Sequence, residues 1–287
     1  MRRMKRGLLL LPLLALALFA TACGSEDALS LDPVASAATK TSDAGSARTA
    51  FTLSMKMNGQ NMRMGGAGQF DFDGHTGAMT MDMSSLLPAG AGRDGKLEMR
   101  MIGSKMYMRL PESLTQGQQV PGHTPWISID LGKALNKLGL GNLDPTNLQQ
   151  DPTKTLELLR ASSSSVTETG KAAIRGVPTT RYTAKLDLRK SLEQSTKQLK
   201  LTDEQRAQLR RTMQQLSTQT GLTTIPVDVF VDGEGLLRRM TMNMKVTTGL
   251  APFSMTQTTD FYDFGVDVDV KAPPASEVTD LTGLMNP

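Results

Sequence analysis

Methionine is the residue type in this chain whose number and spacing point most directly to a chemical role. The sequence contains 19 methionines among 287 residues, and many stand two positions apart in Met-x-Met pairs. In a β-strand, such a pair places both thioethers on one face of the sheet, about 7 Å apart. Methionine is unbranched and polarizable, so it adapts to ligands of irregular shape. The pairs therefore favour a surface that accommodates a lipid, although an ordinary core between a sheet and helices has the same periodicity.

The methionines expected to line this lipid-binding space come from four segments. They are Met55, Met57, Met81, Met83, Met99, Met101, Met242 and Met244. A further interpretation is capture of Cu(I), because soft thioether ligands select that ion. One strand pair is too widely spaced to chelate without a third ligand from a neighbouring strand, and His75 and His123 are the only imidazoles. We therefore expect no metal and no cofactor, and a Met-rich Cu(I)-binding protein is one further alternative.

Residues that could form a catalytic site are few. A single cysteine, Cys23, and two histidines argue against a structural zinc site and against a catalytic Cys/His pair. The serine run Ser162–Ser165 lacks a Gly-x-Ser-x-Gly elbow and a nearby histidine base. Asp71, Asp73 and His75 alternate along one segment, but Asp73-Gly74 is typical of a turn. We expect a protein that is not an enzyme and has no catalytic residues.

The charge balance argues against nucleic acid as a partner. Lys and Arg total 32 against 28 Asp and Glu, but four basic residues precede the first apolar run. They are Arg2, Arg3, Lys5 and Arg6. Without them the two signs balance, whereas binding to nucleic acid requires clustered positive charge.

The first 23 residues resemble an export signal that ends in a bacterial lipobox. Residues 1–6 are mostly basic, residues 7–19 form an apolar run, and Ala20-Thr21-Ala22 directly precedes Cys23. The apolar run of about thirteen residues is shorter than the roughly 20 that a transmembrane helix needs. We therefore expect residues 1–22 to be a signal peptide and Cys23 to be lipidated, which anchors the protein to the extracytoplasmic face of the cell membrane. The alternative is ordinary secretion with a spare thiol.

The mature chain is expected to be a tether, residues 23–46, followed by a single domain, residues 47–287. The tether is rich in Ser, Ala, Asp and Thr, although Val34, Ala37, Ala38 and Thr41 have helical spacing. In the domain, period-two segments predict an antiparallel meander between residues 51 and 108 and further strands within residues 166–188 and 227–270. Asn58-Gly59 is a strong hairpin signal between the first two strands.

Three helices are expected between or beside these strands. From Trp126 to Arg160 the apolar period lengthens, which predicts one helix near residues 131–138 and a second that begins at Asp151-Pro152. A third helix begins with a capping box at Thr202–Gln205 and ends before Gly221. The tail from Pro273 is expected to be a loop.

Four segments of the mature chain resemble actinobacterial lipoproteins of the LppX/LprG type. They are Asp151–Lys154 with Leu158-Leu159, Gly176–Tyr182, Pro226–Asp232, and Phe261–Gly265 with Ala272–Pro274. The resemblance implies the fold of the carriers LolA and LolB. That fold is of the α+β class, with a strongly curved antiparallel sheet, an incomplete β-barrel, and helices packed on its concave face. It also implies that acyl chains bind between the sheet and the helices.

We therefore expect a membrane-anchored lipoprotein that binds, carries or presents an acylated amphiphile: a lipid, a lipoglycan or a lipoprotein. Its expected partners are the membrane, through the lipid anchor, the lipid or lipoglycan ligand, and an envelope transporter. The alternative function is a solid-cored envelope interaction module that binds protein or a cell-wall polymer through its outer face.

Overall fold

The computed structural model describes residues 32–57, 59–86, 95–111, 124–137, 159, 163–197, 202–246 and 252–283. The strands in these residues are β1 (Ser46–Met57), β2 (Gln60–Asp71), β3 (Thr76–Asp82), β4 (Lys96–Ile102), β5 (Lys105–Arg109), β6 (Trp126–Asp130), β7 (Ser163–Ile174), β8 (Val177–Asp187), β9 (Thr224–Asp232), β10 (Leu237–Val246), β11 (Phe253–Tyr262) and β12 (Val278–Asp280). The helices are α1 (Asp32–Asp43), α3 (Leu131–Lys137), α5 (Leu188–Lys197) and α6 (Asp203–Thr220), with short 3-10 helices η1 (Ser84–Leu86) and η3 (Ala275–Glu277).

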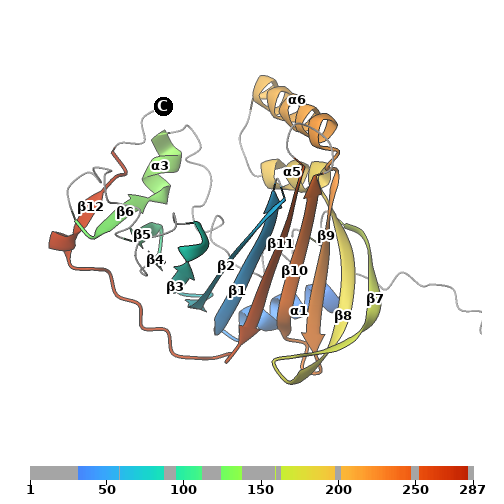
Figure 1. Ribbon diagram of the computed structural model, residues 1–287, viewed down its shortest axis with the longest axis horizontal. Coiled ribbons are helices and arrows are strands. Elements are labelled where there is room, and N and C mark those ends of the chain that lie inside the picture. The colour runs from blue at the N-terminus through green and yellow to red at the C-terminus, as the bar shows by residue number, and fades with distance from the viewer. Residues whose placement is uncertain are drawn as a thin grey trace, which may run out of the picture.

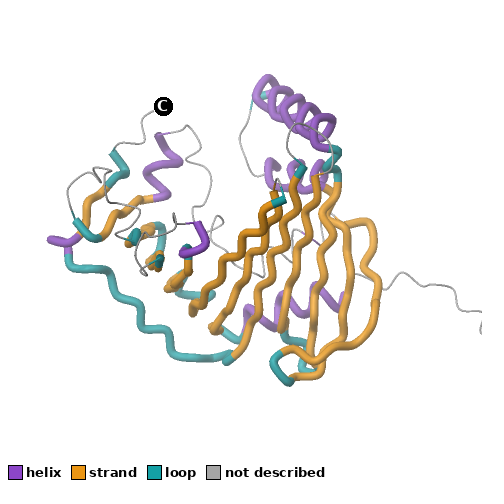
Figure 2. Tube along the Cα trace, in the orientation of Figure 1, coloured by secondary structure: helices purple, strands orange, loops and turns teal. Residues whose placement is uncertain are grey.

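The twelve strands form one sheet (Figure 1) in the order β12-β6-β5-β4-β3-β2-β1-β11-β10-β9-β8-β7. All neighbouring strands are antiparallel except β12 and β6, which are parallel. Strands β12 and β7 are the two free edges, so the sheet does not close into a barrel. In Figure 2, β8–β11 run lengthwise whereas β4 and β5 are seen nearly end-on, so the sheet curves strongly. The predicted fold class, a curved antiparallel sheet with helices, is confirmed.

The sheet differs from the sequence prediction at three places. Strand β6 lies where the lengthened period predicted the start of a helical region. Residues 266–270, predicted to be a strand, have no ladder partner and instead form an extended segment that leads to η3. The tail predicted to be a loop contains β12, which pairs with β6. Of the helix predicted from Asp151-Pro152, the described residues include only Leu159, which is helical.

The two faces of the sheet differ in chemistry because the strand register is continuous across it. Met55 on β1 stands directly opposite Met62 on β2 and Met255 on β11, so all three side chains share a face. The neighbouring residue Ser54 stands opposite Arg63 and Thr256 on the other face. One face is thus apolar and the other polar, as an antiparallel sheet with one solvated side requires.

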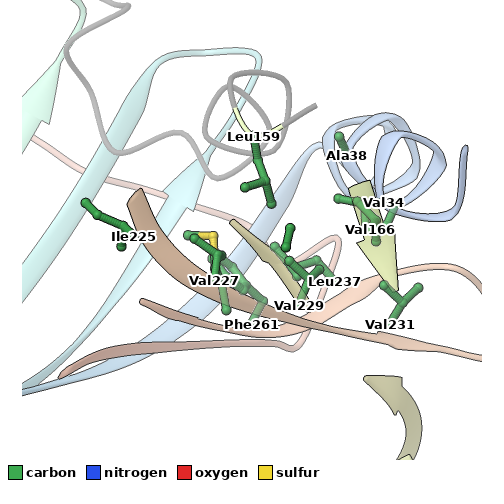
Figure 3. Packing of buried hydrophobic residues seen from close by; sticks show 13 residues of the cluster. Val34, Ala38, Leu159, Val166, Ile225, Val227, Val229, Val231, Leu237 and Phe261 are labelled. Atoms are coloured by element: carbon green, nitrogen blue, oxygen red, sulfur yellow. The ribbon is translucent and has the colours of Figure 1, made fainter. Parts of the chain in front are cut away.

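The hydrophobic core lies on the apolar face, where α1 packs against β9 and β10. Val34, Ala37 and Ala38 of α1 belong to one buried cluster with Leu159, Val229 and other β-strand residues (Figure 3). The buried Thr41 hydroxyl accepts a 2.9 Å hydrogen bond from the Leu237 backbone N–H. The helix that forms within the predicted tether therefore contributes to the core.

Helix α6 begins and ends where its sequence predicts. The Thr202 hydroxyl accepts a hydrogen bond from the Gln205 N–H at 3.2 Å, and the Gln205 side chain accepts one from the Thr202 N–H at 2.9 Å. Gly221 follows the helix in the left-handed conformation, with φ of 68°. This reciprocal capping satisfies backbone groups that the first turn leaves free.

Glycines in β2 and β3 allow aromatic rings to lie flat across the apolar face. Phe51 on β1 stands opposite Gly66 on β2. A Cβ atom at Gly66 would lie 2.5 Å from Cε1 of Phe51 and would also meet the Thr80 carbonyl oxygen. Phe70 occupies the same position over Gly77 of β3. Glycine is therefore required at these positions by the neighbouring ring.

Gly66→Ala is expected to lower the free energy of unfolding by about 2 kcal/mol, because the added methyl group displaces the Phe51 ring and presses on the adjacent strand. Gly65→Ala is the matched control, since its Cβ would lie at 3.4 Å from the Phe51 carbonyl oxygen, an ordinary contact. The control is expected to change stability by less than about 0.5 kcal/mol. Urea unfolding of both variants measures the difference. Equal stability of the two variants would show that the ring does not depend on this glycine.

Candidate functional site

Fourteen methionines on seven strands lie in register on the apolar face, which we call the methionine face. They are Met55, Met57, Met62, Met64, Met79, Met81, Met99, Met101, Met106, Met108, Met240, Met242, Met244 and Met255. Because directly opposite residues in antiparallel strands point to the same side, this placement follows from the register alone. The face extends without interruption from β10 to β5.

Seven of these methionines form two straight lines across neighbouring strands. The four-methionine line is Met62, Met55, Met255 and Met244, on β2, β1, β11 and β10. The three-methionine line is Met79, Met99 and Met108, on β3, β4 and β5. Neighbouring strands are about 4.8 Å apart, so the side chains within a line are in contact range of one another.

The part of the apolar face that α1 and Leu159 cover carries β-branched residues, whereas the rest carries mostly methionine. Under α1 and Leu159, strand β9 carries Ile225, Val227, Val229 and Val231, and all four are buried. The methionines are mostly half-buried, and Met57 is 43% exposed; Met64 and Met240 are the buried exceptions. β-branched residues fit strands and packed cores better than methionine does. Met240 belongs to the core cluster, and Met242 and Met244 pack against it. The methionines of β1–β5 and β11, apart from the buried Met64, therefore mark the part of the face that the core leaves accessible.

The methionine face is free of charge over a wide area. In β1–β6, β10 and β11, which are described throughout, no residue in register with the methionines has an ionisable side chain. Its polar residues are Thr49, Gln60, Gln257 and Thr259. On β8, opposite Val229 of β9, burial raises the pKa of Tyr182, with a smaller contribution from Glu168, so that phenol stays neutral at physiological pH. Such a surface can bind apolar groups but offers no acid or base.

Charges gather on the opposite, polar face. The Arg239 guanidinium donates two hydrogen bonds to Asp260, at 2.5 and 2.9 Å. Arg181 donates to Asp228 at 2.7 Å, and the same carboxylate accepts from the Thr183 hydroxyl. These hydrogen bonds raise the pKa of both arginines, so both guanidinium groups remain charged. The carboxylates of Asp228 and Asp260 are thus both paired with guanidinium groups on the polar face.

Seven of the eight methionines predicted to line a binding space lie on the methionine face. The eighth, Met83, follows the end of β3, and its N–H donates to the Gly95 carbonyl at 2.8 Å. The prediction omitted half of the face: Met62, Met64, Met79, Met106, Met108, Met240 and Met255. The hairpin signal at Asn58-Gly59 could have identified the first two, because a two-residue loop pairs Met57 with Gln60 and hence Met55 with Met62.

The other residues considered from sequence do not join this site. The Asp71 carboxylate accepts hydrogen bonds from the Asp73 and Gly74 N–H groups. Asp71 therefore stabilises the turn that precedes β3, and this turn also contains His75. Cys23 and His123 lie outside the described residues. Within the described ranges, no group of three or more His, Cys, Asp or Glu side chains is placed to hold a metal ion. None of the helices in these ranges is both long and apolar enough to cross a membrane.

A pocket of about 410 Å³ lies elsewhere, where the β7–β8 turn approaches the end of β9. Its lining residues are Lys171, Ala172, Ala173, Pro178, Thr179, Thr180, Val231, Asp232 and Gly233. None of them is a methionine or a residue predicted to line the lipid-binding space. The methionine face remains the candidate site.

Comparison with known proteins finds similarity to lipoproteins and to one bacterial relative. No protein-family model matches the chain. A Streptomyces griseus protein, described as an uncharacterized 31.2 kDa protein in the rplA-rplJ intergenic region, is 29% identical over 255 residues, or 86% of this chain and 77% of that protein. The Mycobacterium tuberculosis lipoprotein LppX has 12% identity and a TM-score of 0.46, over 84% of this chain and 100% of LppX. LprF from Mycobacterium bovis has 11% identity and a TM-score of 0.40, over 85% and 96% of the two chains.

Proposed function

We propose that this chain is a non-catalytic lipoprotein that binds the acyl chains of an amphiphile on its methionine face and carries or presents it at the membrane surface. The amphiphile is a membrane lipid, a lipoglycan or a lipoprotein, which share acyl chains as the recognised group. The observation that carries the proposal is the continuous, uncharged surface of fourteen methionines, most of which are half-buried.

The composition of this surface supports a variable ligand. A strand face that served only as a core would be expected to use β-branched residues, as β9 does with Val227 and Val229. Methionine has no branch and several rotatable bonds, so neighbouring side chains can rearrange around acyl chains of different length. Burial contributes about 0.8 kcal/mol for each CH₂ group, which offsets the cost of taking a chain out of the bilayer.

The proposed anchor would keep the methionine face near its source of lipid. Nine residue steps separate Cys23 from Asp32, the first residue of α1. A chain of that length spans at most about 32 Å. Helix α1 packs on the same side of the sheet as the methionines. A lipidated Cys23 would therefore hold this side of the sheet within reach of the membrane surface.

Native mass spectrometry tests the proposal. The chain from residue 23 onward, with Cys23→Ser to prevent acylation, is purified from an actinobacterial host and measured before and after organic extraction. We expect adducts of defined lipid mass that extraction removes. A bare protein mass that persists after incubation with vesicles of host membrane lipid would contradict the proposal and favour an envelope interaction module.

A further inference from the structure

A single Met-x-Met strand lacks a third sulfur ligand for a metal ion, and the four-methionine line provides one from a neighbouring strand. Met55 has a methionine directly opposite on each side, Met62 on β2 and Met255 on β11. Met255 is flanked in the same way by Met55 and by Met244 on β10. Three thioethers from three adjacent strands are therefore neighbours at two overlapping positions, although the residues are up to 200 positions apart in the sequence.

The spacing allows three of these sulfur atoms to converge on one ion. Directly opposite residues in an antiparallel pair have Cβ atoms about 4.5–5.5 Å apart. Methionine side chains are long and have three rotatable bonds, so the two outer sulfurs can reach a point above the central one. Met99, flanked by Met79 and Met108, repeats this arrangement in the three-methionine line.

The donor set determines which ion would bind. Thioethers are neutral, soft ligands that select Cu(I) among biological metals, whereas Mg²⁺ and Ca²⁺ require oxygen ligands. Within the described strands around both lines, no carboxylate, imidazole or thiol is in register to add a harder ligand. The half-buried state of Met55, Met255 and Met99 leaves their side chains accessible from solvent.

We propose that each methionine line binds one Cu(I) ion through three thioether sulfurs: Met55 and Met255 with Met62 or Met244, and Met99 with Met79 and Met108. The ion is bound as Cu(I) and released as Cu(I), with no electron transfer. This proposal is independent of acyl binding, because it depends on sulfur and not on apolar character. Since both ligands use the same face, they compete for it.

Titration with Cu(I) under anaerobic conditions, in competition with bicinchoninate, tests the proposal on the mature chain with Cys23→Ser, which removes the only thiol. We expect two Cu(I) ions per chain and an X-ray absorption spectrum with sulfur as the nearest scatterer. Met55→Leu with Met255→Leu should reduce the stoichiometry from two ions to one. Met79→Leu with Met99→Leu should remove the other ion.

The matched control is Met101→Leu with Met106→Leu. These two methionines are directly opposite each other, but their outer neighbours are Gly77 and Ile129, so they lack a third thioether in line. The control should still bind two ions. Because leucine keeps the face apolar, all three variants should retain lipid adducts in the mass spectrum, which separates loss of copper from loss of lipid binding. Absence of Cu(I) binding by the parent chain, or unchanged binding by the line variants, would overturn the proposal.

Discussion

Replacing Met55 and Met99 together by lysine is expected to weaken lipid binding by a factor of at least about 100, equivalent to about 2.8 kcal/mol. Each residue has a methionine directly opposite on both neighbouring strands, so an acyl chain lying on the face covers it. An ammonium group covered by hydrocarbon loses its hydration and finds no carboxylate among the register neighbours, which costs several kcal/mol. The lipid-free protein avoids this cost, because lysine at a half-buried position extends its charge to water.

Ser54→Lys with Thr80→Lys is the matched control for this variant. Both residues are exposed, and both lie on the polar face, next to Met55 and beside Met79 and Met81. The control adds the same charge to β1 and to β3, the strand that pairs with β4, and should retain lipid. Lipid adducts are counted by native mass spectrometry, and circular dichroism checks the fold. Normal lipid binding by the methionine variant would place the ligand elsewhere, and its unfolding would indicate a solid core with no room for a ligand.

Ala37→Asp is expected to lower the free energy of unfolding by about 3–5 kcal/mol. Ala37 is fully buried in the cluster between α1 and the sheet. A carboxylate at this position would be surrounded by Val34, Leu237 and the β9 valines, which offer it no hydrogen bond or countercharge. The chain would have to detach α1 to hydrate the new charge.

Ser36→Asp tests the same carboxylate one position away, on the exposed side of α1. We expect this control to change stability by less than about 0.5 kcal/mol. Urea unfolding, followed by circular dichroism, compares the two variants. If both unfold at the same urea concentration as the parent chain, α1 behaves as part of a tether and not as part of the core.

The meander could be predicted because its determinants are local. Period-two alternation and the Asn58-Gly59 turn specify β1 and β2 and their register, and helical spacing at Val34, Ala37 and Ala38 indicated α1. Strand β6 was missed because it has only five residues and runs directly into α3. Its Ile127 faces the methionines, while Trp126 is covered on the polar face by the guanidinium groups of Arg100 and Arg109, at 4.5 and 5.6 Å from the ring centre. The alternation of Ile127 and Ile129 with Ser128 and Asp130 is therefore too short to separate this strand from the helical period that follows it.

The C-terminal segment illustrates the opposite error. Val266, Val268 and Val270 alternate with exposed aspartates, which is the pattern of a strand, yet this segment forms no ladder. Hydrogen bonds hold its two ends: the Ser46 hydroxyl donates to the Val266 carbonyl, and Arg100 donates to the Lys271 carbonyl at 2.9 Å. Alternation of apolar and polar residues indicates that one side of an extended segment is covered, but it does not indicate that the backbone is hydrogen-bonded to a neighbouring strand. The pairing of β12 with β6 was equally inaccessible, because it joins segments about 150 residues apart.

The candidate site was predictable in kind but not in extent. Met-x-Met spacing indicated which side chains share a face within a strand, and seven of the eight selected methionines lie on it. Joining these strands into one surface required the pairing of β1 with β11, and no local pattern encodes that contact. The four-methionine line is a product of this long-range register, whereas the three-methionine line lies within the local meander of β3, β4 and β5.

Because β1 pairs with β11, the methionine face is completed only late in folding, when the C-terminal strands join the sheet. During synthesis or N-terminal-first export, β1–β6 emerge long before β10 and β11, and until then β1 has one unpaired edge and half of its apolar surroundings. Contacts this distant in sequence form slowly, since the intervening chain must be ordered first. The complete methionine face therefore exists only in the finished molecule, and a truncated chain without β10 and β11 would expose apolar strands and lack the four-methionine line.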